Sequence, residues 1–128
     1  MTQLYRLRID ESCLEQGVRF VGFTEKKIIE DTQITQIGEE LSSFFNERDS
    51  NYDPQSHLAL DFAGVDFLSN VTLGKLITAD RAHFELYKNR LGMVNIKPAI
   101  YEVFVFTKLT SLFNIAETRE AYLAEFCA

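Results

Sequence analysis

The stretch that decides the fold is residues 58–77, LALDFAGVDFLSNVTLGKLI. It opens with an apolar run that ends at Asp61, which is typical of a central strand. Turn residues at 63–64 follow, and a second short strand is predicted over 65–68. From there the apolar residues recur at helical spacing and mark one buried side, made of Leu73, Leu76, Ile77 and Phe84. The stretch therefore predicts strand, turn, strand and helix, with the strand ending at 69–70 and the helical period returning from Val71.

Upstream of this stretch, the sequence predicts a hairpin and then a helix. Residues 5–9 and 18–23 each alternate apolar with polar or charged residues, and a turn around 15–17 separates them, so they are expected to pair as antiparallel strands. After residue 32 the spacing becomes helical, and Asp31 or Thr32 is placed to cap the exposed N–H groups at the helix start. The apolar side of this helix consists of Ile34, Ile37, Leu41, Phe44 and Phe45.

Downstream, shorter elements follow the same alternation. A buried strand is predicted over 93–96, after turn formers at 89–92, and Pro98 suits the first turn of a third helix. A last short strand over 114–116 and a helix over 118–126 complete the order. Because strands alternate with helices, we predict an α/β fold with a mixed sheet of four to five strands, an N-terminal antiparallel hairpin and about four helices. The polar segment 48–56 is expected to be a surface loop, and residues 1–128 a single domain.

Composition and charge limit the kind of partner. The chain has 128 residues, of which 46% are hydrophobic, and this supply is sufficient for an independent core. Its formal net charge of -6 repels the phosphates of nucleic acids and anionic membrane surfaces, so neither is expected as a partner. No segment is apolar enough for a signal peptide or a membrane span, so we expect a cytoplasmic protein. Cys13 and Cys127 are expected to be free thiols in a reducing cytosol, and a bridge between them stays open as an alternative.

No pattern of catalytic residues is present. The sequence lacks the nucleophile, phosphate-loop, dinucleotide and zinc motifs of common enzymes. His57 and His83 are interpreted as solvated surface residues, Asp61 as a strand end and Asp66 as a solvent-facing turn residue. We therefore predict no catalytic residue, no metal and no cofactor. An enzyme whose site is assembled from residues scattered along the chain stays open as an alternative.

Residues 58–77 resemble the central signature of the STAS family, in which a strand ending in Asp leads through a turn to a Ser-rich loop and a helix. Segments 32–41, 92–98 and 107–115 resemble, in the same order, the family's first helix, its third core strand with the following helix start, and its "T-x-L-x-x-L-F-x-I" segment. The positions of the central signature that match in type and spacing are Asp61, Val65, Phe67, Leu73, Gly74 and Leu76.

The resemblance implies a protein-binding regulatory module of the anti-sigma-factor-antagonist type. In such modules the unmodified domain binds a kinase or anti-sigma partner, and phosphorylation of the loop releases it. The physical basis is that a helix N-terminus tolerates phosphate within its own domain, whereas the added charge opposes docking. The family's docking surface corresponds here to the segment 68–75 with the start of the first helix, so the expected partner-binding residues are Glu30, Asp31, Ser69, Asn70, Thr72 and Lys75.

The sequence departs from the family at the loop itself. Ser69 stands where the family has Asp, Asn70 where it has the phosphorylated Ser, and Thr72 where it has Gly. Either Ser69 or Thr72 serves as the modified hydroxyl, or the domain is locked in a partner-binding form, which is our working hypothesis. A purely structural alternative is that Ser69 and Asn70 only cap the helix. Two further functions stay open, namely a scaffold subunit of a signalling assembly and a small-ligand or nucleotide-binding STAS domain.

Overall fold

The computed structural model describes residues 6–10, 12–46, 57–87 and 89–126. The predicted loop at 48–56 and Cys127 lie outside these ranges. The helices are α1 (Asp31–Asn46), α2 (Asn70–Tyr87), α3 (Pro98–Phe106) and α4 (Arg119–Phe126), with short 3-10 turns at Leu14–Gln16 and Leu109–Ser111. The strands are β1 (Leu7–Asp10), β2 (Val18–Phe23), β3 (Lys27–Ile28), β4 (His57–Asp61), β5 (Phe67–Leu68), β6 (Gly92–Val94) and β7 (Asn114–Ile115).

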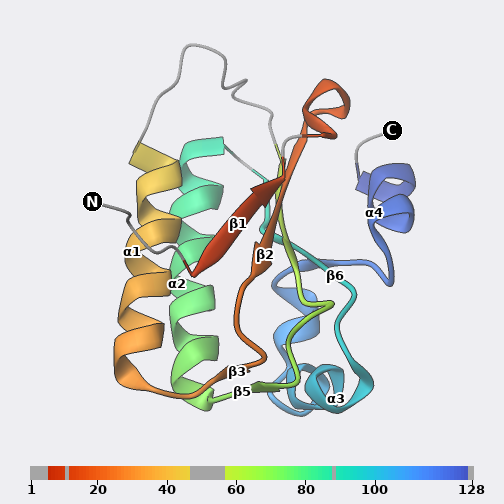
Figure 1. Cartoon of the computed structure of the whole chain (residues 1–128). Coiled ribbons are helices and arrows are strands. Elements are labelled where there is room, and N and C mark those ends of the chain that lie inside the picture. The colour runs from red at the N-terminus through yellow and green to blue at the C-terminus, as the bar shows by residue number, and fades with distance from the viewer. Residues whose placement is uncertain (1–5, 11, 47–56, 88, 127–128) are drawn as a thin grey trace.

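Within the described ranges, the main sheet has five strands in the order β1-β2-β4-β6-β7. The β1–β2 pair is antiparallel and the other three pairs are parallel, so the predicted mixed sheet with an N-terminal hairpin is confirmed (Figure 1). β4, the strand predicted from the apolar run before Asp61, lies in the centre. It is buried on both faces, as the near-continuous apolar character of its sequence indicates.

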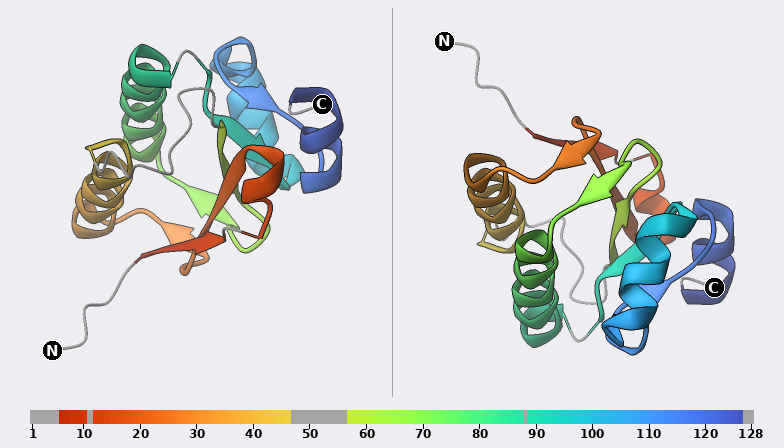
Figure 2. Two further views of the ribbon diagram at one scale, coloured as in Figure 1. Left: turned by 90° about the horizontal axis from the view of Figure 1, so that it is seen from above. Right: turned by 90° about the horizontal axis from the view of Figure 1, so that it is seen from below.

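Helices cover both faces of this sheet (Figure 2). α1, α2 and α3 contribute Ile37, Leu76 and Phe104 to a core that lies on one face. α4 covers the opposite face, where Tyr122 packs with residues of β2, β4 and β6 in a second, smaller core. None of the helices in the described ranges has the length and apolar character needed to cross a bilayer.

A second, small sheet was not expected from the sequence. β3 and β5 pair in parallel through Lys27 with Phe67 and Ile28 with Leu68. The predicted strand over 65–68 is thus confirmed only in its second half, and its partner strand was missed, because two residues after a charged segment show no alternation. In Figure 1 this pair runs beneath the first turns of α1 and α2.

The buried side of α2 differs from the prediction near its end. His83 is fully buried, with its Nδ1 2.8 Å from the carbonyl oxygen of Asn89, and burial lowers the pKa of His83. The interpretation of His83 as a solvated residue is therefore wrong. Phe84, expected to be buried, is instead exposed, and the Arg90 guanidinium lies 4.1 Å from its ring centroid. His57 is partly buried, which lowers its pKa as well.

Candidate functional site

The candidate site is the end of the molecule where α1 and α2 begin. α2 starts at Asn70, directly after β5, and α1 starts three residues after β3 ends. The N–H of Ser69 donates to the carbonyl oxygen of Ile28 at 3.1 Å, so the β3–β5 pair ties the two helix starts together (Figure 1). The predicted helix entrance near Ser69 is therefore present, and it lies at one end of the fold outside the main sheet.

A chain of hydroxyl groups holds the start of α2. Ser69 Oγ accepts from the N–H of Thr72 at 3.3 Å, as a capping residue does. Thr72 Oγ1 donates to the Ile28 carbonyl at 3.1 Å. Because a hydroxyl has one hydrogen, Ser69 Oγ must be the donor in its 3.0 Å contact with Thr72 Oγ1. Thr72 is 1% exposed, whereas Asn70 is exposed on the first turn of the helix.

The start of α1 is held by Gln33. Its Oε1 accepts from the N–H groups of Ile29 at 3.1 Å and Glu30 at 2.9 Å. Its Nε2 donates to the carbonyl oxygen of Lys27 at 3.0 Å and to the carboxylate of Glu25. The capping role expected of Asp31 or Thr32 therefore falls to Gln33, whose side chain reaches back as in a capping box. The side chains at positions 30 and 31 are left exposed at the site.

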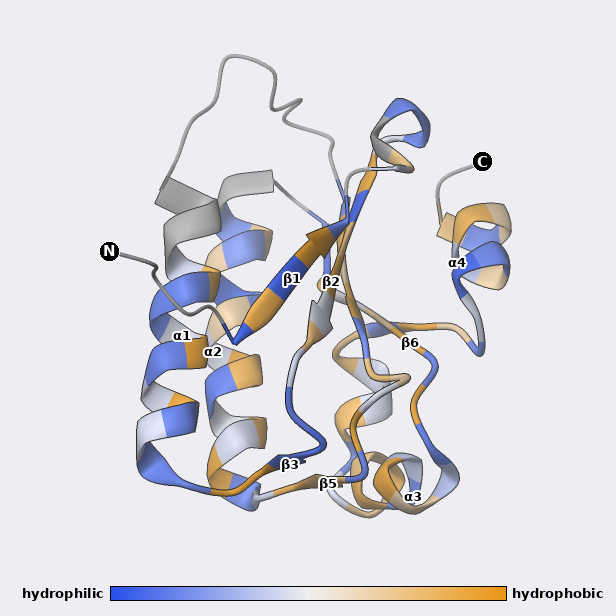
Figure 3. Cartoon of the chain, in the orientation of Figure 1, coloured by the Kyte–Doolittle hydropathy of each residue, from blue (hydrophilic) through white to orange (hydrophobic). Residues whose placement is uncertain are grey.

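Exposed apolar side chains surround the two helix starts. Ile29, Phe67 and Val71 are 48%, 53% and 58% exposed. Figure 3 shows β5 and the end of β3 in the colour of hydrophobic residues, at the foot of α1 and α2. Val71 lies within the predicted docking segment 68–75. Ile29 and Phe67 are not among the predicted partner-binding residues, because each stands beside core residues of its own element and residue type does not distinguish it from them. Exposed apolar residues that gather in one place mark interaction surfaces.

The residues predicted for partner binding all lie at this end of the molecule. All of them except the buried Thr72 are at least partly exposed. Glu30, Asp31, Asn70 and Lys75 are exposed and Ser69 is partly exposed. The stem of Lys75 lies over α1, because a Cβ at Gly38 would be 3.6 Å from its Cδ. Thr72 is a supporting residue beneath the surface. Its position therefore makes Ser69 the more accessible of the two hydroxyls predicted as modification sites.

Basic groups of β3 and of the segment before α3 lie near Asp66, beside the site. Asp66 is exposed, as expected, and its carboxylate pairs with the ammonium of Lys97. Lys97, followed by the nearby charges of Lys26 and Lys27, lowers the pKa of Asp66 below its usual value. The site therefore has both basic groups, at Lys26, Lys27 and Lys97, and acidic groups, at Glu30 and Asp31 where α1 begins.

Asp61, the strand-end carboxylate of the family signature, has a structural role. It is 8% exposed and accepts hydrogen bonds from the Nδ2 of Asn95 at 3.0 Å, the N–H of Ala63 at 2.9 Å and the Nε of Arg119 at 2.7 Å. Burial acts to raise the pKa of Asp61, but these donors outweigh it and the pKa is lowered. Arg119 also donates to Asp10 at 2.6 Å, so one guanidinium links β1, β4 and α4.

The similarity of this chain to known proteins lies in its structure and not in its sequence. No protein-family model and no curated protein sequence matches the chain. An anti-sigma-factor antagonist (STAS) domain protein from Planctomyces limnophilus superposes with a TM-score of 0.76 at 14% identity, covering 95% of this chain and 98% of the other. An anti-sigma factor antagonist from Mycobacterium paratuberculosis has a TM-score of 0.71 at 19% identity, with 92% and 90% covered.

The phosphorylated form of SpoIIAA, a Bacillus cell fate determinant, is also similar in structure. Its TM-score is 0.61 at 16% identity, and the similarity covers 90% of this chain and 95% of the other. These similarities extend over nearly the whole described chain and include both the mixed sheet and the helices on its two faces. The chain therefore has the fold of a STAS domain of the kind found in anti-sigma-factor antagonists.

Proposed function

We propose that the chain is a protein-binding regulatory module of the anti-sigma-factor-antagonist type, whose partner is a kinase or an anti-sigma factor. The docking face consists of residues 67–75 with Ile29, Glu30 and Asp31. The observation that carries the proposal is the set of exposed apolar side chains, Ile29, Phe67 and Val71, at the helix entrance. An apolar centre with a charged rim is the usual composition of a docking surface. A single domain over 1–128 and a cytoplasmic location belong to the same proposal.

The loop supports a partner-binding form that phosphorylation does not switch off. The exposed position on the first turn of α2 is Asn70, which has no hydroxyl group. The hydroxyls of Ser69 and Thr72 are engaged with each other, with the N–H of Thr72 and with the Ile28 carbonyl. A phosphate on either would break these hydrogen bonds, and on Thr72 it would also require opening of a buried position. The Bacillus protein, by contrast, has been observed in a phosphorylated form.

The first prediction concerns the apolar centre of the face. Val71→Asp is expected to weaken partner binding by at least roughly tenfold, because the new carboxylate must be desolvated when the partner docks. The fold is expected to tolerate the change, since an acidic residue in the first turn of a helix is favourable. The assay is titration calorimetry with the kinase or anti-sigma factor that co-purifies with the tagged chain from its native host.

Val105→Asp is the matched control, because Val105 is a helical valine with nearly the same exposure, 52%, on α3. It is expected to leave the partner's affinity unchanged, and thermal unfolding verifies that both variants are folded. Equal affinity of wild type and Val71→Asp would contradict the assigned face. Absence of any kinase or anti-sigma factor among the co-purifying proteins would contradict the proposed class of partner.

The second prediction restores the missing hydroxyl. Asn70→Ser places a serine at the exposed first-turn position, and the cognate kinase with ATP is expected to phosphorylate it, whereas wild type stays unmodified. Phosphosite mapping by mass spectrometry provides the measurement, and the phosphorylated variant is expected to lose the partner through the added charge. Asn70→Ala is the control without a hydroxyl. Stoichiometric phosphate on Ser69 or Thr72 of wild type would refute the locked form.

A further inference from the structure

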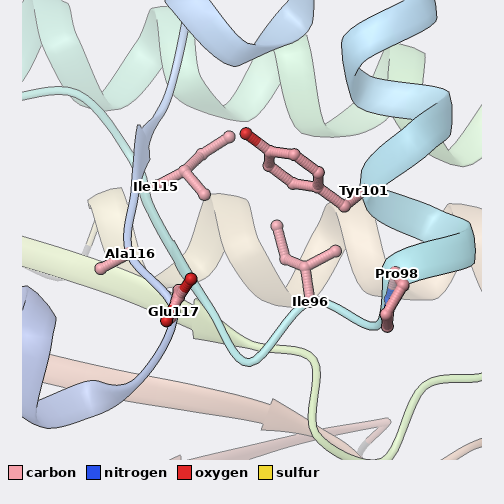
Figure 4. Close-up of a pocket in the computed structure, with 6 residues that line it drawn as sticks. All are labelled: Ile96, Pro98, Tyr101, Ile115, Ala116 and Glu117. Atoms are coloured by element: carbon pink, nitrogen blue, oxygen red, sulfur yellow. The ribbon is translucent and has the colours of Figure 1, made fainter.

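A cavity lies away from the docking face, at the carboxyl ends of two neighbouring parallel strands. Its volume is about 350 Å³. It opens beside the first turn of α3, where the chain leaves β6 and β7 (Figure 4). This size is within the range of small-molecule sites, and the carboxyl ends of parallel strands are the usual place for ligands in open α/β sheets. The lining residues are Ile96, Pro98, Tyr101, Ile115, Ala116 and Glu117.

The lining combines apolar walls with two polar groups. Ile96, Pro98 and Ile115 provide aliphatic surface. In Figure 4 the ring of Tyr101 extends from α3 toward Ile115, and the carboxylate of Glu117 lies on the connection that leads to α4. The carbonyl oxygen of Glu117 accepts from the N–H of Asn95 at 3.1 Å, which fixes the backbone under this carboxylate.

The negative charge of Glu117 is not neutralised by a neighbour. Within the part of the chain that the structure describes, neither its carboxylate nor the Tyr101 hydroxyl forms a hydrogen bond or ion pair. The basic residues that adjoin the lining segments in sequence have other partners, since Lys97 pairs with Asp66 and Arg119 pairs with Asp10 and Asp61. The cavity is therefore partly open to solvent and has aliphatic walls, together with an exposed carboxylate that has no cationic partner and the exposed ring of Tyr101, in a chain of net charge -6.

We propose that this cavity binds a small organic cation, namely a primary ammonium group on a short apolar body. Glu117 is its counter-ion, the ring of Tyr101 contributes a cation–π contact, and the aliphatic walls contain the body. The same carboxylate repels ligands that carry phosphate, which excludes nucleotides from this cavity. The proposal is independent of the docking face, because the two sets of residues do not overlap.

The test uses 2-phenylethylammonium as the probe, with ¹H–¹⁵N correlation spectra of the full chain as the readout. We expect saturable shifts at the amides of Ile96, Tyr101 and Glu117 at millimolar concentrations, as is usual for a ligand of this size. Neutral 2-phenylethanol, which has nearly the same shape, is expected to bind at least roughly tenfold more weakly, because it lacks the charge. No shift at these amides, or equal affinity for both compounds, would overturn the proposal.

Glu117→Gln removes the charge and retains the shape of the side chain. It is expected to raise the dissociation constant of the ammonium probe at least roughly tenfold and to leave that of the alcohol unchanged. Glu102→Gln is the matched control, because Glu102 is exposed on α3 and does not line the cavity. Equal losses in the two variants would indicate net charge alone and would refute the site. Partner affinity is expected to be unchanged in Glu117→Gln, so this result does not depend on the docking proposal.

Discussion

Replacement of Gly92 by alanine is expected to destabilise the protein by about 3 kcal/mol, because the added methyl group overpacks a closed part of the core. A Cβ built at Gly92 would lie 2.4 Å from Cε2 of Tyr122 and 2.6 Å from both its Cζ and its hydroxyl oxygen. Carbon atoms in contact are normally about 3.5–4 Å apart. One of the two elements, β6 or α4, therefore has to move.

Neither element has room to yield. Tyr122 is 0% exposed, and its ring packs against Phe20 and Phe126 at centroid distances of 6.1 Å and 5.0 Å. Its hydroxyl lies 3.3 Å from Nδ1 of His57. On the other side, Gly92 is held in register between β4 and β7 in the parallel part of the sheet. A shift large enough to accommodate the methyl group would break contacts on one of these sides.

Gly22→Ala is the control for the loss of a glycine. Gly22 also lies in a strand of the main sheet, and a Cβ there would meet no atom within 4 Å, so stability is expected to change by less than about 1 kcal/mol. The measurement is the free energy of unfolding from urea titration. In the double variant Gly92→Ala with Tyr122→Leu, the destabilisation is expected to be smaller than the sum of the single effects. Additive effects, or a Gly92→Ala variant as stable as wild type, would contradict the assigned contact.

The role of Gly92 illustrates which features the sequence predicts. The sequence favours a turn at Gly92, because glycine is a turn former. In the structure Gly92 lies in β6, and a glycine is needed there because Tyr122 of α4 approaches its backbone closely. The order of the main elements was predictable because their signals are local, namely the helical periodicity of α1 and the continuous apolar run of β4. β3 was missed because it exists only through its pairing with β5.

The candidate site shows the same division between local and distant signals. The helix entrance near residues 69–72 could be predicted from neighbouring residues, and α2 begins at Asn70. The burial of Thr72 could not, because it depends on the carbonyl of Ile28, which is 44 positions away. His83 is buried beside the Asn89 carbonyl, and residue type alone favoured Phe84 for that side of the helix. The cavity at Glu117 is assembled from two separate stretches of the chain, 96–101 and 115–117, so no single motif indicates it.

Arg119→Met is expected to destabilise the protein by about 2 kcal/mol at pH 7. The guanidinium pairs with Asp61 at 2.7 Å and with Asp10 at 2.6 Å, and its loss leaves two carboxylates without their cation. Methionine retains most of the packing on Phe20, whose ring centroid lies 4.6 Å from the guanidinium carbon. The expected loss is smaller than for a fully buried pair, because Arg119 and Asp10 are about a third exposed.

This loss is expected to diminish as the solution becomes acidic. In wild type, hydrogen bonds from Ser12 and Arg119 lower the pKa of Asp10 to about 2, and the pKa of Asp61 is lowered too. A carboxylate whose pKa is lower in the folded chain stabilises the fold above its ordinary value near 3.8 and loses that contribution as pH falls toward the folded value. In Arg119→Met, Asp61 loses the hydrogen bond and the positive charge of Arg119, which lower its pKa in wild type. Burial then raises the pKa of Asp61, so acid neutralises its unpaired carboxylate.

The measurement is the unfolding free energy of both proteins between about pH 7 and pH 3. The difference between them is expected to be largest at neutral pH and to shrink below about pH 4, where wild type loses the contribution of its carboxylates and the variant regains stability. Arg81→Met is the matched control, because Arg81 is exposed on α2 and forms no ion pair within the described ranges. Its effect is expected to stay within about 0.5 kcal/mol at every pH. A constant difference for Arg119→Met would mean that packing on Phe20, and not charge, links α4 to the hairpin.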